Sequence, residues 1–124
     1  MNWTIWMIMG SIFSGLGVAF GAFGAHALKA RLSPDMLAIF EVGVRYQMYH
    51  ALALLGVGLL GTRVEHIGIK VTGITFVLGI IIFSGSLYAL SLSGQRFLGA
   101  ITPIGGVLFL VGWISLTISL FKLG

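Results

Sequence analysis

The sequence predicts an all-α integral membrane protein, a bundle of four transmembrane helices joined by short connections. Of its 124 residues, 58% are hydrophobic and only 8% are charged, whereas soluble domains carry about 25% charged residues. Apolar runs fill nearly the whole chain, and about 20 apolar residues suffice to cross a bilayer as a helix. We therefore expect a single membrane domain over residues 1–124, with no separate soluble module.

The first span is predicted over residues 3–28, and it ends at the charged residues Lys29 and Arg31. No Lys or Arg precedes this apolar run, and the run is too long for the apolar region of a cleaved signal peptide. We therefore expect a first helix that is retained in the membrane.

A second helix is predicted to start near residue 34. Ser33 suits the N-cap, Pro34 suits the first turn, and Asp35 favours the positive end of the helix dipole. The helix can run to about Gly61, a length of about 42 Å that exceeds the ~30 Å hydrocarbon core. We expect its first turns in the headgroup layer and its membrane span over residues 46–61.

Two further spans complete the predicted bundle. A polar loop over residues 62–70 is expected to precede the third span, at residues 71–92, and the last span is predicted over residues 98–121. Thr102 followed by Pro103 is typical of a cap and a first-turn proline. Regular helix is therefore expected to begin there, after an irregular entry.

Small residues recur at intervals of four residues. They are Gly17, Gly21 and Ala25 on one face of the first span, Ser11, Gly15 and Ala19 on another, and Gly85, Ala89 and Ser93 on the third span. Small residues at this spacing let helix backbones approach closely in a membrane. We expect tight packing within one chain, and the alternative is homo-oligomerisation through one of these faces.

The charge and the residue types exclude several classes of function. The formal charge is +4 and there is no cysteine. In a membrane protein such an excess of Lys and Arg belongs in loops beside anionic headgroups, so the expected partner is the lipid bilayer and not nucleic acid. The sequence has no nucleophile with an evident base and no motif such as His-Glu-x-x-His, so we expect neither an enzyme nor a cofactor.

The Lys and Arg residues are nearly balanced between the two sides of the predicted bundle. The first and third connections with the start of the second helix hold four of them, and the opposite side holds three. Because cytoplasmic loops are enriched in these residues, both termini are predicted to face away from the cytoplasm.

Most polar side chains are expected near one membrane face, because consecutive spans alternate in direction. This polar end is formed by the first and third connections. Its candidate site residues are His26, Glu41, Arg45, Tyr46, Gln47, Tyr49, His50, Ser84, Ser86, Tyr88 and Thr102.

Two pairs at the polar end have more than one interpretation. Glu41 and Arg45 either anchor the second helix in the headgroup layer, which we favour, or lie deeper and relay ions or protons. His26 and His50 are expected at similar depth, where paired imidazoles can ligate haem iron or share a metal. The commoner role for such a histidine is a hydrogen bond to a carbonyl or a tyrosine, and we favour that role.

Two pairs of aromatic residues fit the membrane interfaces. Tyr46 and Tyr49 at the polar end, and Trp3 and Trp6 at the opposite face, are each typical of an interfacial aromatic belt.

Four ordered motifs carry a family resemblance. They are Gly21-Ala22-Phe23-Gly24-Ala25-His26, Tyr46-Gln47-Met48-Tyr49-His50-Ala51-Leu52-Ala53, Phe83-Ser84-Gly85-Ser86-Leu87-Tyr88 and Leu98-Gly99-Ala100-Ile101-Thr102-Pro103-Ile104-Gly105-Gly106. Together they closely resemble the small bacterial membrane family catalogued as domain of unknown function 423. The resemblance covers nearly the whole chain. It implies a multi-pass protein of the bacterial cytoplasmic membrane, and it implies no mechanism.

Two classes of function follow. The favoured one is a non-enzymatic structural or accessory component of the membrane, as a homo-oligomer or within a larger complex. The alternative is a small conduit or binder for an ion, a proton or an amphiphile, with the polar end as its mouth. A dry, packed polar end favours the first class, and a hydrated or ligand-filled cavity favours the second.

Overall fold

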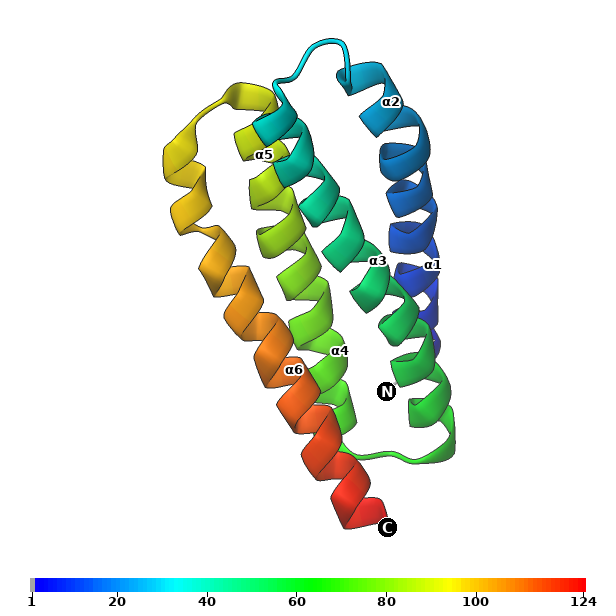
Figure 1. The fold of residues 1–124 in the computed structure, drawn as a ribbon. Helices are drawn as coiled ribbons and strands as arrows, with labels where there is room; N and C mark the ends of the chain where they lie inside the picture. The colour runs from blue at the N-terminus through cyan, green and yellow to red at the C-terminus, as the bar shows by residue number, and fades with distance from the viewer. Residues whose placement is uncertain (1) are drawn as a thin grey trace.

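The computed structural model describes residues 2–124, which form four antiparallel helical segments with short turns between them (Figure 1). No strand occurs in this part of the chain, so the all-α prediction is confirmed. The segments are α1 (Thr4–Val18), η1 (Ala19–Gly24) and α2 (Ala25–Leu28); α3 (Pro34–Arg63); α4 (Ile67–Gly79), η2 (Ile80–Ser84) and α5 (Gly85–Ser93); and η3 (Arg96–Ala100) and α6 (Thr102–Leu123).

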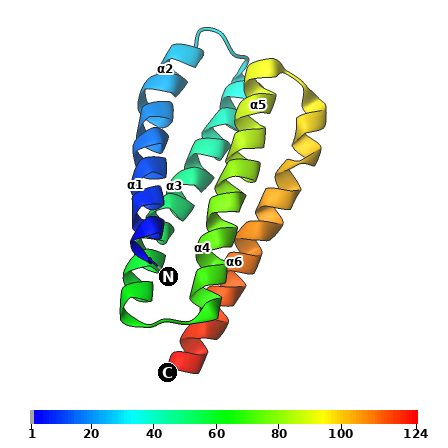
Figure 2. The same cartoon turned by 180° about the vertical axis from the view of Figure 1, so that it is seen from behind.

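The four segments lie side by side in chain order, with α1 and α6 in the outer positions (Figures 1 and 2). α3 packs against α1, α4 and α5, and α6 packs against α4 and η2. Across residues 2–124, α1 and α6 do not pack against each other. The two central segments, α3 and α4 to α5, therefore have helical neighbours on two sides, whereas each outer segment leaves a broad face uncovered.

Three of the four segments are long and apolar enough to cross a membrane. They are Thr4–Leu28, Ile67–Ser93 and Arg96–Leu123. The longest helix, α3 with 30 residues, is not among them, because its charged and polar side chains lower its mean hydropathy. Its central polar residues Gln47 and His50 are only 2% and 4% exposed, so they face protein and not lipid. The four-helix architecture is confirmed, and the crossing by α3 stays a prediction.

The start of α3 is confirmed, whereas the start of α6 differs in one detail. The Ser33 hydroxyl accepts a 3.2 Å hydrogen bond from the Met36 amide, and Pro34 is the first helical residue. α6 begins at Thr102 after the short 3₁₀ segment η3, as expected. The prediction that Thr102 caps the helix is wrong, because its hydroxyl lies 2.6 Å from the Ser86 hydroxyl of α5 and caps nothing.

The predicted polar loop over residues 62–70 is wrong in extent. α3 and α4 leave only residues 64–66 between them. His66 makes this short connection stable, because its Nδ1 accepts a 3.0 Å hydrogen bond from the Gly68 amide and caps α4. Lys70 therefore lies inside a helix, where its long side chain can still reach the headgroups.

One of the two small-residue faces of the first segment packs against α3. A Cβ atom at Gly10 would lie 2.7 Å from the Ala51 carbonyl oxygen, and one at Gly17 would collide with the Met48 sulfur. Because glycine has no side chain at these positions, the backbones of α1 and α3 approach closely. Helices in a membrane pack in this way, since lipid surroundings provide no hydrophobic effect to hold them together.

The other small-residue face is free in this structure. A Cβ atom at Gly15 would meet nothing within 4 Å, and its neighbours Ser11 and Ala19 are exposed. Gly85 on the third segment likewise has open space beside it. Packing within the chain therefore does not explain the small residues on these faces.

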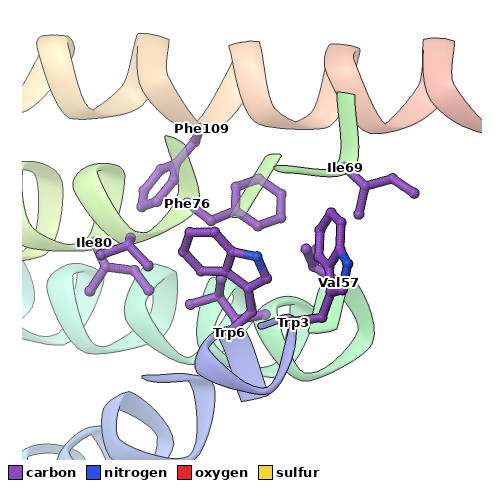
Figure 3. Close-up of a cluster of buried hydrophobic side chains, with 9 residues drawn as sticks. Trp3, Trp6, Val57, Ile69, Phe76, Ile80 and Phe109 are labelled. Carbon is purple, nitrogen blue, oxygen red and sulfur yellow. The ribbon is translucent and has the colours of Figure 1, made fainter. Parts of the chain in front are cut away.

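The buried apolar core joins all four segments near the end of the molecule that holds both chain termini. Figure 3 shows Trp3 and Trp6 reaching from the first segment towards α4, with Phe109 entering from α6. Trp3 and Trp6 are 8% and 6% exposed, so the prediction of an aromatic belt there is wrong. Glycine explains their burial, because a Cβ atom at Gly73 of α4 would lie 2.6 Å from the Trp6 ring.

Candidate functional site

The structure divides the candidate residues among three places. Gln47, Ser84 and Tyr88 meet between α1, α3 and α5, and Ser86 and Thr102 meet beside them. A second place is His50, which lies between α3, α4 and α6. The third place is the exposed surface of α2 and α3, with His26, Glu41, Arg45, Tyr46 and Tyr49.

Gln47 is the centre of the first place. Its Nε2 donates a 2.8 Å hydrogen bond to the Phe13 carbonyl oxygen, and its Oε1 accepts a 2.6 Å hydrogen bond from the Tyr88 hydroxyl. The orientation of the amide follows from its partners, because a carbonyl can only accept. One side chain therefore links three segments of the bundle.

The contacts of Tyr88 hold α5 against α3. Its ring lies 5.4 Å from the Phe20 ring, edge to face, and 5.1 Å from the Phe40 ring. Gly43 makes room for it, because a Cβ atom there would lie 2.8 Å from the Tyr88 ring. The Ser84 hydroxyl then donates a 2.6 Å hydrogen bond to the Gly43 carbonyl oxygen. These contacts join α5 to α3 and to the first segment.

Ser86 and Thr102 fix the entry to α6. The Ser86 hydroxyl donates a 2.9 Å hydrogen bond to the Phe83 carbonyl, and it lies 2.6 Å from the Thr102 hydroxyl. A hydroxyl has a single proton. Thr102 is therefore the donor to Ser86, and its bond attaches the start of α6 to α5.

His50 has partners for both ring nitrogens. Its Nε2 lies 3.0 Å from the Trp113 indole nitrogen, and its Nδ1 lies 2.7 Å from the Tyr46 carbonyl oxygen. An indole N–H only donates and a carbonyl only accepts, so Nε2 is the acceptor and Nδ1 carries the proton. The ring is also stacked on the Phe109 ring, with 3.6 Å between ring centroids. Neither nitrogen is left to bind a metal or to exchange a proton.

The prediction that His26 and His50 lie at similar depth is wrong. Phe40 lies beside Gly24, since a Cβ there would be 3.5 Å from its ring, so His26 is close to the start of α3. His50 lies ten residues beyond Phe40, about 15 Å further along the helix at 1.5 Å per residue. The two imidazoles cannot share an ion, and residues 2–124 contain no cluster of three or more potential metal ligands of the His, Cys, Asp and Glu types.

Gln47 and His50 lie near the midpoint of the 30-residue α3. At the polar end itself, the structure has an apolar hollow of about 320 Å³. It is lined by Phe20, Gly24, Ala27, Leu28, Phe40, Tyr88 and Leu92.

Two further hollows lie along the side of the molecule between α3 and α6. The larger, about 440 Å³, is lined by Tyr46, Tyr49, His50, Phe83, Gly106, Phe109, Leu110 and Trp113. The smaller, about 210 Å³, is lined by Ala53, Gly56, Val57, Leu60, Trp113, Leu116 and Leu120. No charged residue lines either hollow. Trp113 lines both hollows, and we refer to the two together as the groove between α3 and α6.

Trp113 was not predicted as a site residue. In the sequence it is one aromatic residue in an apolar span, which is typical of a side chain that faces lipid. Its partner His50 is 63 residues away, and only the packing of α6 on α4 brings the two together. The sequence carries no signal that would have paired them.

Comparisons with known proteins agree with this architecture. A family model described as a protein of unknown function, DUF423, matches residues 20–106. A UPF0382 membrane protein of Staphylococcus saprophyticus is 45% identical to this chain, over 96% of this chain and 98% of its own length. The UPF0382 membrane protein YwdK of Bacillus subtilis is 42% identical, over 95% and 97%. No solved structure is detectably similar to this chain. Since the family model covers most of the chain and the relatives match almost end to end, the chain belongs to the DUF423 family of bacterial membrane proteins.

Proposed function

We propose that this protein is a non-enzymatic structural or accessory component of the bacterial cell membrane. The observation that carries the proposal is the hydrogen bonding of the buried side chains of Gln47 and His50 to other side chains and to the backbone. Gln47 uses both ends of its amide, and His50 uses both nitrogens. A group that transfers protons needs an atom within reach of its substrate. These side chains serve the packing of the bundle instead.

The same proposal makes α3 the fourth membrane-crossing helix. It lies between segments that are themselves apolar enough to cross, and its polar residues Gln47 and His50 are shielded by those neighbours. From Arg45 to Arg63 the helix covers about 27 Å, close to the ~30 Å hydrocarbon core. Both arginines would then lie at the two headgroup layers, which supports the anchor interpretation of Arg45.

An accessory role needs a surface for another protein, and the free face of α1 suits it. Gly15 lies at its centre with open space around it, flanked by exposed Ser11 and Ala19. In a membrane, such a row of small residues allows a second helix to pack at short range. We place there a helix of a second copy or of a larger complex.

Site-directed crosslinking in intact membranes tests this proposal. The chain has no cysteine, so a Gly15→Cys variant carries one thiol on the free face. Mild oxidation should give a disulfide-linked dimer, or a thiol-to-amine crosslinker should give one defined heavier species. The matched control is Ile118→Cys, at an exposed position of α6, which should give neither. Equal and low yields at both positions would contradict the accessory role.

A further inference from the structure

We propose that the groove between α3 and α6 holds one hydrocarbon chain of an anionic membrane phospholipid, with the phosphate of that lipid at Arg45. This assignment goes beyond the structural role and requires no partner protein, because the groove and the free face of α1 lie on different segments.

The groove exists because α3 and α6 do not pack along their lengths. α3 and α6 both pack against the third segment. The hydrogen bond from Trp113 of α6 to His50 of α3 connects the two helices. The hollows on the two sides of this bridge measure about 440 Å³ and 210 Å³. Along α3 the lining of the two hollows runs from Tyr46 to Leu60, about 21 Å at 1.5 Å per residue. One leaflet supplies about half of the ~30 Å hydrocarbon thickness, so a chain that enters beside Tyr46 would fill most of this length.

The walls of the groove suit a hydrocarbon chain. The larger hollow is lined mainly by aromatic rings and the smaller one mainly by aliphatic side chains. Gly56 opens the smaller hollow further, because a Cβ atom there would meet nothing within 4 Å. The atoms that line an empty space of this kind lack van der Waals partners and therefore lose dispersion energy. In a bilayer, lipid chains are available to make these contacts.

The mouth of the groove suits a phosphate. Arg45 is exposed and precedes Tyr49 by one helical turn, and a guanidinium binds phosphate oxygens through paired hydrogen bonds. The Tyr46 and Tyr49 rings pack edge to face with centroids 5.6 Å apart at the same end. Glu41 lies one turn beyond Arg45, further from the groove, where its carboxylate would meet the outer part of a headgroup. Arg45 is the charged residue nearest to the groove along α3.

Quenching of tryptophan fluorescence by brominated lipid tests the assignment on the full-length protein. Trp113 is 41% exposed in the groove, whereas Trp3 and Trp6 are buried. The protein is placed in phosphatidylcholine nanodiscs that contain a small mole fraction of phosphatidylglycerol with brominated chains. We expect quenching several-fold above the value for random mixing, and a Trp113→Phe variant should lose the excess.

Two pairs of variants separate the headgroup from the chain. Arg45→Gln should return the quenching to the random-mixing value, and Arg45→Lys, which keeps the charge but loses the paired hydrogen bonds, should retain only part of the excess. Gly56→Leu should fill the smaller hollow and reduce the excess. Its control Gly85→Leu also has open space, but it lies outside the groove and should change nothing.

Three results would overturn the assignment. Quenching of the wild-type protein in proportion to the mole fraction of brominated lipid would show that the groove does not retain the anionic lipid. An unchanged excess in Arg45→Gln would remove the phosphate from Arg45. Failure of fully brominated bilayers to quench Trp113 would show that protein, and not lipid, fills the groove. None of these outcomes depends on whether Gly15→Cys crosslinks.

Discussion

Replacing Tyr88 with phenylalanine removes one hydroxyl from the interior of the bundle. That hydroxyl donates the 2.6 Å hydrogen bond to Gln47, while the ring contacts with Phe20 and Phe40 remain. Side-chain hydrogen bonds between membrane helices contribute about 0.6 kcal/mol on average and up to about 1.7 kcal/mol. The Gln47 oxygen also loses its donor, and an unsatisfied buried polar atom costs about 1–3 kcal/mol. We expect Tyr88→Phe to lower the free energy of unfolding by about 1–2 kcal/mol.

A double-mutant cycle isolates the bond itself. Gln47→Leu alone leaves the Tyr88 hydroxyl without an acceptor, and it also removes the bond to the Phe13 carbonyl. With both substitutions present, neither partner of the Gln47–Tyr88 bond is left unpaired. The double variant should therefore be more stable than the sum of the single effects predicts, by about 1 kcal/mol.

Reversible unfolding in mixed micelles, followed by helical circular dichroism during titration with a denaturing detergent, measures all four species. Tyr46→Phe is the matched control, because its hydroxyl lies at an exposed position of α3, and it should leave the free energy of unfolding unchanged. If the two single effects add within about 0.5 kcal/mol, the hydrogen bond makes no net contribution, and our account of the buried polar cluster is refuted.

Three other predictions follow from the packing. Gly10→Leu should destabilise the protein by more than about 2 kcal/mol, the upper range for overpacked cores, because a Cβ atom there lies 2.7 Å from the Ala51 carbonyl. Gly85→Leu, with open space beside it, should leave the free energy of unfolding unchanged in the same titration. Ser33→Ala should cost about 1 kcal/mol through loss of the N-cap of α3, and equal stability of the variant would show that the cap is dispensable.

Helix positions were predictable where local chemistry determines them. The start of α3 follows from Ser33 and Pro34, because a cap and a first-turn proline act within four residues. The lengths of the apolar runs predicted the other three segments to within a few residues of their ends. The early start of α4 was missed, because His66 is a less common N-cap than serine, threonine or asparagine.

The partners of the polar residues were not predictable. Gln47 bonds to Phe13 and Tyr88, which are 34 and 41 residues away. Such contacts depend on how each helix is rotated about its axis, and nearly uniform apolar spans carry little information on that rotation. The sequence therefore predicted which side chains were unusual, but it did not predict which residues they contact.

The central position of α3 explains how this helix can carry polar residues. A helix at the edge of the molecule would expose residues such as Gln47 and His50 to lipid, where polar side chains are costly. Between two neighbours, α3 can turn Gln47 towards α1 and α5, and His50 towards α6. The resulting hydrogen bonds help to hold the helices together in lipid, where the hydrophobic effect does not. α3, whose mean hydropathy is too low for a predicted span, is thus the segment that connects the other three. Its polar residues determine how those segments are arranged around it.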